Sequence, residues 1–433
     1  MERVWSVDLP TRVGQKIVVA GWLHRLRRLS NVSFVILRDG RGLAQVVIND
    51  AALLEQVAAL QPESVLKIYG EAVATEQAPG GVEVVAERVE VVSETSEPPP
   101  FELHRPHVSA QLPTILDHAA LGLRHPRQRA IFRVAAAAAA GFRRTLRAEH
   151  FVEIFTPKLV GTATEGGANV FAVDYFGRRA FLAQSPQLYK QILVGVFERV
   201  FEVGPVFRAE PHDTPRHLNQ YCSLDAELGF IEDHTSVMAV IERVIRGMLA
   251  EIQAEAGADL ALAQCTLPDV PARVPVVDFV EAQQLIQAAT GEVVVGELDL
   301  APGHERWLGE WAVREFASDF LFVVGYPLAK RPFYTHPDPA RPESSNSFDL
   351  LFRGLEVVTG GQRLHTYAAY LDALAQRGQD PEPLAGFLEA FKHGMPPHGG
   401  FAMGLERWVA RLVGAANVRE TTLFPRDLQR LTP

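Results

Sequence analysis

Short apolar runs, separated by glycine, proline and polar residues, fill the first 93 positions of the chain. Runs of this length between turn residues are typical of β-strands. Strands packed this densely in a short segment favour a small closed β-barrel, because closure leaves no edge strand unpaired. The runs lie at 18–22, 34–37, 44–48, 65–69 and 82–92.

The pattern changes after residue 93. Residues 94–125 contain Glu97-Pro98-Pro99-Pro100, which stiffens a chain into an extended linker. A long helix is predicted from Pro126 to about His150. Helical stretches then alternate with apolar strands, which we place at 181–183, 200–206, 320–324, 348–352 and 399–403. We therefore expect an α+β protein with a barrel domain over 1–93, a linker over 94–125 and a larger domain over 126–433.

Composition narrows the class of protein. Cys222 and Cys265 are the only cysteines among 433 residues, which excludes a disulfide framework. No run reaches the roughly 20 apolar residues of a membrane span. We expect a cytoplasmic protein with neither a membrane nor DNA as a partner. The net charge of −10 argues weakly against nucleic acid, but it does not describe one face. Arginine clusters at 25–28 and 124–129 remain candidate phosphate contacts.

Two motifs place arginines where a nucleotide could bind. Phe207-Arg208-Ala209-Glu210 precedes a polar loop and a return strand, and Arg208 could grip a phosphate or carboxylate with two hydrogen bonds. By itself, this pattern fits a surface hairpin with ion pairs equally well. Gly404-Leu405-Glu406-Arg407 follows small residues that would let a planar ring lie against the backbone. The second motif is weak alone and strong together with the first.

Two further motifs suggest ligands for a cation and for an amino acid. Asp349, Glu356 and Thr359 offer oxygen ligands suited to magnesium that bridges phosphates. Ion pairing of the two acids with nearby arginines is the competing interpretation. Gln187 and Lys190 share one face of a helix that begins near Pro186. An ordinary amphipathic helix would show the same spacing.

In this order, the four motifs resemble those of class II aminoacyl-tRNA synthetases of the aspartate, asparagine and lysine group. The resemblance covers nearly the whole chain. It implies an N-terminal OB-fold that binds the anticodon and a catalytic antiparallel sheet flanked by helices. It also implies that the helix at 126–150, with Phe151 to Pro157, forms a homodimer interface. The interval from Glu227 to Phe348 is too short for the extra domain of bacterial aspartate enzymes, so the archaeal-type aspartyl branch is the better match.

The resemblance also implies roles for individual residues in binding ATP and Mg²⁺. Arg208 and Arg407 would be catalytic. Asp349, Glu356 and Thr359 would hold magnesium, although the family usually has serine in place of Thr359. The ATP-binding residues would be Arg208, Glu210, Arg216, His217, Leu218, Tyr221, Glu356, Gly404, Leu405, Glu406 and Arg407.

A site for L-aspartate needs cations for its side-chain carboxylate, and Lys190 and Arg363 match the family's aspartate-binding positions. An asparaginyl-tRNA synthetase is the main alternative, but it is not expected to keep Lys190. Family resemblance assigns the substrate ammonium to Asp225 and to Glu165 on a glycine-rich loop. The full predicted set is Glu165, Gln187, Lys190, Arg208, Asp225, Thr359 and Arg363.

For the barrel, the resemblance assigns anticodon contacts to Arg28, Phe34 and Gln45. Enzymes that charge only tRNA-Asp tend to have tryptophan and lysine where this chain has His24 and Pro79. We therefore favour an enzyme that charges both tRNA-Asp and tRNA-Asn. The alternatives are a strictly tRNA-Asp-specific enzyme, an inactive tRNA-binding paralogue and an asparagine synthetase. The intact motifs argue against the inactive paralogue, and the barrel argues against the asparagine synthetase.

Overall fold

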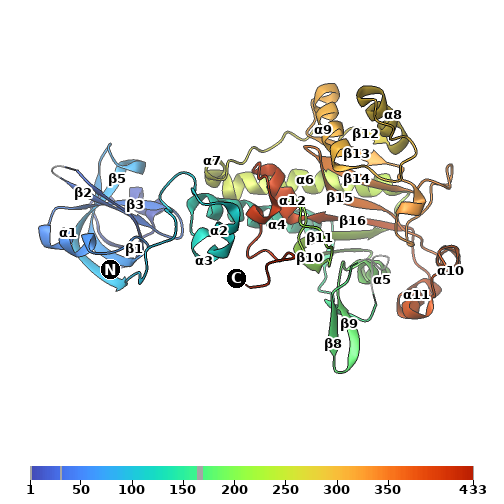
Figure 1. The fold of residues 1–433 in the computed structure, drawn as a ribbon, viewed down its shortest axis with the longest axis horizontal. Helices are drawn as coiled ribbons and strands as arrows, with labels where there is room; N and C mark the ends of the chain where they lie inside the picture. The colour runs from blue at the N-terminus through green and yellow to red at the C-terminus, as the bar shows by residue number, and fades with distance from the viewer. Residues whose placement is uncertain (1, 30–31, 163–168, 433) are drawn as a thin grey trace. The chain divides into compact units, whose positions relative to one another are not determined.

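The computed structural model describes residues 2–29, 32–162 and 169–432. The chain divides into two compact units, unit 1 (residues 1–129) and unit 2 (residues 130–433), drawn in Figure 1. Each is described on its own below. No helix in the described part of the chain is long and apolar enough to cross a membrane.

Unit 1 contains a closed five-stranded barrel with strand order β1-β2-β3-β5-β4, as the apolar pattern predicts. Val35, Leu37 and Val46 point into its core, whereas their neighbours along each strand face outward. The β3–β5 pair is parallel and the other pairs are antiparallel. The strands are β1 (Lys16–Arg28), β2 (Ser33–Arg38), β3 (Leu43–Ile48), β4 (Val65–Ala74) and β5 (Val82–Ser93).

Helices of unit 1 are short. Asp50 caps α1 through a hydrogen bond that its carboxylate accepts from the Leu53 amide at 2.9 Å. The helical elements are η1 (Ser6–Arg12), α1 (Ala51–Ala58), η2 (Pro79–Gly81), α2 (Leu112–Asp117) and α3 (Ala119–Gly122).

Unit 2 is built on an eight-stranded sheet with the order β12-β13-β14-β15-β16-β11-β10-β6. Its six central strands, β13 to β10 in this order, pair antiparallel, whereas the edge pairs β12–β13 and β10–β6 are parallel. The strands are β6 (Val152–Glu153), β10 (Arg199–Phe207), β11 (Gln220–Gly229), β12 (Val276–Asp278), β13 (Phe320–Val324), β14 (Ser347–Phe352), β15 (Leu355–Gln362) and β16 (His398–Gly404).

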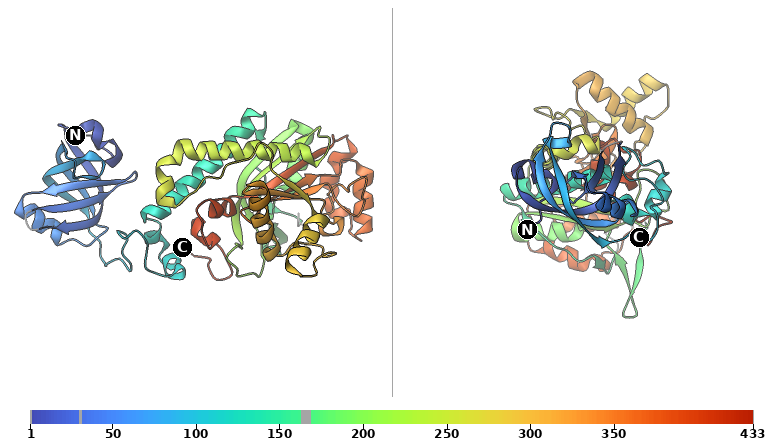
Figure 2. Two further views of the ribbon diagram at one scale, coloured as in Figure 1. Left: turned by 90° about the horizontal axis from the view of Figure 1, so that it is seen from above. Right: turned by 90° about the vertical axis from the view of Figure 1, so that its left-hand side faces the viewer.

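Two long helices, α4 (Pro126–Ala148) and α6 (His234–Ala256), run side by side in unit 2 (Figure 2). Gly141 makes their close crossing feasible, because a Cβ there would lie 2.7 Å from the Met248 Cα. Both helices contribute to the main core with residues of the central strands, such as Phe201 and Phe401. The first helix ends at Ala148, two residues before the predicted end at His150.

The remaining elements of unit 2 surround the sheet. A separate three-stranded sheet consists of β7 (Leu159–Val160), β9 (Arg178–Leu182) and β8 (Ala172–Tyr175). The helices are α5 (Gln187–Phe197), α7 (Leu260–Ala263), α8 (Phe279–Thr290), α9 (Pro302–Phe316), α10 (Tyr367–Gln376), α11 (Ala385–Lys392) and α12 (Leu405–Leu412). The short 3-10 segments are η3 (Gly257–Asp259), η4 (Leu328–Lys330), η5 (Glu382–Leu384) and η6 (Val418–Thr421).

Candidate active site

A cavity lies over strands β11, β15 and β16 of unit 2. Ten of the eleven residues predicted to bind ATP line it, and Leu405 lies between two that do. These ten come from three separate motifs, which the antiparallel sheet brings together. The lining comprises Arg208, Glu210, Arg216, His217, Leu218, Tyr221, Ser223, Glu356, Val357, Thr359, Ala402, Met403, Gly404, Glu406, Arg407 and Val418.

Arg208 extends from the end of β10 toward an aromatic ring. Its guanidinium carbon lies 5.7 Å from the centre of the Tyr221 ring. Its Nη1 lies 3.7 Å from Oε1 of Glu210. The Asn219 side-chain amide donates to the carbonyl oxygens of Arg208 (2.7 Å) and Glu210 (3.1 Å). This amide therefore fixes the turn that presents both side chains to the cavity.

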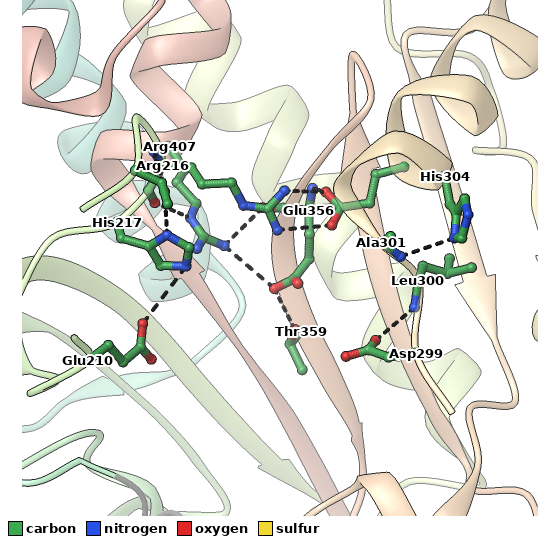
Figure 3. A network of polar contacts seen from close by, with 12 residues as sticks. Glu210, Arg216, His217, Asp299, Leu300, Ala301, His304, Glu356, Thr359 and Arg407 are labelled. Atoms are coloured by element: carbon green, nitrogen blue, oxygen red, sulfur yellow. Dashed lines mark hydrogen bonds and ion pairs between the residues drawn. The ribbon is translucent and has the colours of Figure 1, made fainter. Parts of the chain in front are cut away.

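At the other side of the cavity, two arginines meet two carboxylates (Figure 3). Arg216 donates two hydrogen bonds to Glu305, at 3.0 and 3.4 Å, and Glu305 also accepts one from the Glu356 amide at 3.1 Å. Arg407 Nη1 lies 3.8 Å from Oε1 of Glu356. Burial raises the pKa of the Glu305 carboxyl. Sequence reasoning missed Glu305, since no motif surrounds it on α9.

Hydrogen bonds from Arg419, near the C-terminus, hold the polar loop that precedes β11. Arg419 donates to the Asp213 carboxylate at 2.8 Å and to the Thr214 carbonyl oxygen at 3.1 Å. The same guanidinium pairs with Asp427. These bonds order the loop that presents Arg216 and His217 to the cavity.

Glu406 links α12 to β11. Its two carboxylate oxygens accept hydrogen bonds from the Cys222 amide at 2.9 and 3.1 Å. Burial raises the pKa of this carboxyl from its ordinary value of 4.5 to about 7. Its carboxylate is thus engaged with the β11 backbone, while the residue also lines the cavity.

The three predicted magnesium ligands lie together on β14 and β15. Thr359 Oγ1 donates to Oε1 of Glu356 at 3.0 Å, and Thr359 pairs with Asp349 across the two strands. Arg331 donates to Oδ2 of Asp349 at 2.9 Å, while Oδ1 is buried with no hydrogen-bond partner in the described part of the chain. Burial raises the pKa of the Asp349 carboxyl to about 6.

This donor set fits magnesium bound to substrate phosphates. Among the described residues, no group of three or more His, Cys, Asp or Glu side chains could hold a metal. Magnesium in nucleotide sites is held by one or two carboxylates, with phosphates and waters as its other ligands. Two carboxylates and a hydroxyl satisfy that requirement. Glu356 is the better placed, because it lines the cavity whereas Asp349 does not.

The predicted aspartate-binding cations are buried behind this cavity and are paired with acids. Lys190 Nζ lies 3.0 Å from Asp225 Oδ1 and 3.3 Å from Glu227 Oε2. Arg363 Nε donates to Glu227 Oε1 at 2.8 Å. Burial raises the pKa of the Glu227 carboxyl, but Arg363 and Lys190 outweigh it and hold the pKa below its ordinary value. Sequence reasoning missed Glu227 as a member of this site, although it lies two residues after Asp225.

Of two other predicted aspartate-binding residues, the structure describes Gln187 but not Glu165. Gln187 is buried at the start of α5, and its Nε2 has no hydrogen-bond acceptor among the described residues. An unsatisfied buried donor beside Lys190 is what a site lacking its polar ligand would show. Glu165 lies outside the described residues.

The predicted anticodon contacts lie on the outside of the barrel. Ile36 pairs with Gln45 across β2 and β3, and Phe34 lies two residues from Ile36, so Phe34 and Gln45 share a face. This face is opposite the one that fills the barrel core. Gln45 Nε2 donates to Glu83 at 3.0 Å. Arg28 is exposed at the end of β1.

The two predicted tRNA-discrimination residues differ in their setting. His24 is 7% exposed at a bulge in β1, and its Nδ1 lies 3.3 Å from Arg38 Nη1. Arg38 is itself bound by Glu63 through two hydrogen bonds of 2.7 Å. His24 could therefore influence a bound base only through its neighbours. Pro79 begins η2 between β4 and β5.

Comparison with protein families agrees with this geometry. Residues 111–428 match the family described as tRNA synthetases class II (D, K and N). The chain belongs to this family. Residues 17–92 of this class II synthetase match the OB-fold nucleic acid binding domain. The fold class predicted from the sequence is thereby confirmed.

Relatives of this class II synthetase match it from end to end. It is 47% identical to the Aspartate--tRNA(Asp/Asn) ligase of Thermus thermophilus, and the match covers 100% of both chains. It is 45% identical to the enzyme of the same name from Deinococcus radiodurans, covering 100% of this chain and 99% of the relative. The solved asparaginyl-tRNA synthetase of Pyrococcus horikoshii, complexed with asparaginyl-adenylate, superposes with a TM-score of 0.93 at 32% identity, covering 100% of both chains.

Proposed function

We propose that this class II synthetase uses ATP and Mg²⁺ to activate L-aspartate, and that it transfers the aspartyl group to the 3′ end of tRNA-Asp and tRNA-Asn. The observation that carries the choice of amino acid is the buried pair Lys190 and Arg363. Asp225, the partner of Lys190, accepts a hydrogen bond from Ser223 of the cavity lining. Full-length relatives named as Aspartate--tRNA(Asp/Asn) ligases support the same reaction. Both cysteines are free thiols, which fits a reducing cytoplasm.

In the activation step, the α-carboxylate of aspartate attacks the α-phosphorus of ATP. The nucleophile is already ionised, so the reaction needs positioning and charge stabilisation but no general base. Arg208 would bridge the carboxylate and the α-phosphate. Glu210 would accept from the adenine amino group, and the ring would stack between Tyr221 and Arg407. Arg216 and His217 would clamp the β- and γ-phosphates.

Magnesium would be held by Glu356, Asp349 and Thr359. Bound there, it would neutralise charge on the phosphates and hold them in the orientation needed for attack. Leu218, Gly404, Leu405 and Glu406 would shape the nucleotide site. In the second step, a ribose hydroxyl at the tRNA 3′ end attacks the adenylate.

Selection of aspartate over asparagine rests on charge compensation. In the absence of substrate, Lys190 and Arg363 are balanced by Asp225 and Glu227. The substrate brings an ammonium for Asp225 and a side-chain carboxylate for the cations, so the balance is kept when it binds. Asparagine brings no second carboxylate and would leave one buried positive charge uncompensated. Gln187 and Glu165 would complete the site.

The decisive experiment is ATP–pyrophosphate exchange with each amino acid. Wild-type protein should exchange with aspartate and only weakly with asparagine. Arg363→Leu should abolish exchange with aspartate while ATP still binds, and Arg363→Lys should retain part of it. Melting temperatures would show whether each variant is folded. Near wild-type exchange by a folded Arg363→Leu variant would refute the assignment of this site.

For tRNA choice, we propose relaxed specificity. The anticodons of tRNA-Asp and tRNA-Asn differ at their third letter, C against U. Proline at position 79 offers neither a side-chain donor nor a backbone N–H to read that letter. Losing one base contact typically relaxes selection by about 1–3 kcal/mol, by analogy with base-edge readout.

Charging of separately purified tRNA-Asp and tRNA-Asn transcripts tests the proposal for specificity. We expect comparable charging of both by the wild type and a raised preference for tRNA-Asp in Pro79→Lys. A wild-type preference above about a thousandfold, equivalent to about 4 kcal/mol, would establish the strict alternative instead.

We further propose a homodimer formed through α4 and the segment 151–157. Two apolar side chains of this segment are uncovered in the single chain: Val152 is 40% exposed and Phe155 83%. Exposed apolar residues in a cluster are typical of a protein–protein interface, and isologous two-fold dimers are the commonest assembly.

A further inference from the structure

A second cavity of about 460 Å³ adjoins the proposed ATP site. Arg216, His217, Arg407 and Val418 line both cavities. The second cavity therefore begins at the residues that we assign to the β- and γ-phosphates. Its other walls come from α9, from the turn between β14 and β15, and from α12.

The lining of this second cavity is strongly basic. It contains Arg216, Arg306, Arg407 and Arg411, and no acidic side chain among the described residues. Two of the four arginines have carboxylates nearby: Arg216 pairs with Glu305 at 3.0 Å, and Arg407 lies 3.8 Å from Glu356. In the described ranges, no carboxylate lies within ion-pair distance of Arg306 or Arg411.

Arg411 shows most clearly how the excess of positive charge in this cavity affects a single side chain. Its Nε is buried and has no hydrogen-bond acceptor among residues 2–29, 32–162 and 169–432. Burial lowers the pKa of its guanidinium. Glu305 opposes this shift, and the smaller effects of the nearby Arg216, Arg306 and Arg353 charges add to it. A cluster of four guanidinium groups with carboxylates beside only two of them favours a bound anion, because the anion removes both the repulsion and the unmet hydrogen bonds. Arginine's planar fork suits phosphate oxygens in particular.

We infer that the second cavity binds the pyrophosphate that leaves when aspartyl-adenylate forms, with Arg306 and Arg411 as its ligands. The inference rests on the proposed function. In that reaction, a bond forms between the carboxylate oxygen and the α-phosphorus. The bond from the α-phosphorus to the bridging oxygen breaks, and its electron pair leaves with pyrophosphate. No proton or redox partner is needed.

The position of these two arginines implies that they bind the product pyrophosphate but not the reactant ATP. Neither Arg306 nor Arg411 lines the ATP-site cavity. They contribute no contact to ATP there, but lie where a released diphosphate would move past Arg216 and Arg407. Substituting them should therefore weaken pyrophosphate binding with little change in ATP binding.

The test measures the KM for pyrophosphate in ATP–pyrophosphate exchange, at saturating ATP, aspartate and Mg²⁺. The variants are Arg306→Gln, Arg411→Gln and the double variant. Arg314→Gln is the matched control, since Arg314 is on the same helix as Arg306 and lines neither cavity. We expect the pyrophosphate KM to rise at least about fivefold in each single variant and more in the double variant, as loss of a charge-assisted hydrogen bond implies. The KM values for ATP and aspartate should stay within about twofold.

Calorimetric titration with magnesium pyrophosphate, without ATP or amino acid, separates this inference from the proposed function. Wild type should bind and the double variant should bind at least about tenfold more weakly, whichever amino acid the enzyme activates. Unchanged pyrophosphate affinity in a folded double variant would overturn the inference. An equal rise in the ATP KM would assign both arginines to the ATP site instead. A rise in the tRNA KM alone would assign the cavity to the tRNA backbone, and would also overturn it.

Discussion

At the residue scale, buried charges in this synthetase are organised as compensated groups. Glu227 is fully buried, and it is tolerated there because Arg363 and Lys190 lie at 2.8 and 3.3 Å. Glu305 similarly balances Arg216. Glu406 differs from both, because no cation contributes to its shifted pKa and it is held by a backbone amide.

Glu406 should therefore make stability depend on pH. Its folded pKa of about 7 lies above the ordinary 4.5, so the folded state holds this proton more tightly than the unfolded state. The wild type consequently loses stability as pH rises from about 4.5 to about 7. Glu406→Gln stays neutral. It should match the wild type below about pH 4 and exceed it by up to about 3 kcal/mol near pH 8.

The measurement is the free energy of unfolding in urea, monitored by circular dichroism, for the wild type and Glu406→Gln across this pH range. Glu389→Gln is the control, because Glu389 is 59% exposed beside Lys392 and His393. Its unfolding midpoint should keep the wild-type pH dependence. Parallel curves for wild type and Glu406→Gln would contradict the assignment of a raised pKa.

At the element scale, the site depends on the close approach of three neighbouring strands, β11, β16 and β15. Gly400 on β16 is packed so tightly that a Cβ would lie 2.2 Å from the Ala226 carbonyl oxygen and 2.0 Å from Glu227 Oε2. We interpreted the small residues of β16 as a platform for a planar ring. Ala402, Met403 and Gly404 do line the cavity, whereas Gly399 and Gly400 serve strand packing instead.

Gly400→Ala should therefore disrupt the catalytic sheet. The methyl group would displace β11 or the Glu227 carboxylate, and overpacking of this kind typically costs about 1–3 kcal/mol or more. Gly386→Ala is the matched control, since a Cβ at Gly386 in α11 meets no atom within 4 Å. It should be neutral or more stable by up to about 1 kcal/mol. Melting temperatures and exchange rates of the two variants would test this, and equal behaviour would refute the packing argument.

At the scale of the whole molecule, unit 1 contains the outer barrel face that we propose for the anticodon, and unit 2 contains the proposed site of aspartate activation. The proposed homodimer would join two copies of unit 2. Phe155, at 83% exposure, is its clearest test position.

Phe155→Asp should weaken dimerisation. A buried aromatic anchor at an interface is typically worth about 2 kcal/mol or more, so the dissociation constant should rise by at least about thirtyfold. Sedimentation equilibrium at micromolar protein would measure it. Phe176→Asp serves as the control, because Phe176 is 89% exposed at the turn between β8 and β9, outside the proposed interface. A wild-type monomer with full activity would exclude the homodimer.

Local signals in the sequence predicted the barrel and most strands of the main sheet, but not β12 (Val276–Asp278). The residues that line the proposed ATP site were predicted from motifs around Arg208, Glu356 and Arg407 together with their resemblance to the family. The strand ends were not predicted: the run at 18–22 is only the middle of β1 (Lys16–Arg28), and β14 is buried on both faces, so its burial shows no period of two. Lys190 and Arg363 were predicted as aspartate-binding cations because they match the family's positions, since the local pattern around Lys190 fits an ordinary amphipathic helix as well.

Which charges balance one another became clear only from the packing of distant segments. Glu305 meets Arg216 across 89 positions, and Glu227 meets Arg363 across 136, and no local pattern encodes such pairs. The burial of His24 beside Arg38, and the meeting of Arg306 with Arg411 at a second cavity, arise in the same way. Charge compensation depends on distance and burial, and both are set by how distant segments pack rather than by their order along the chain.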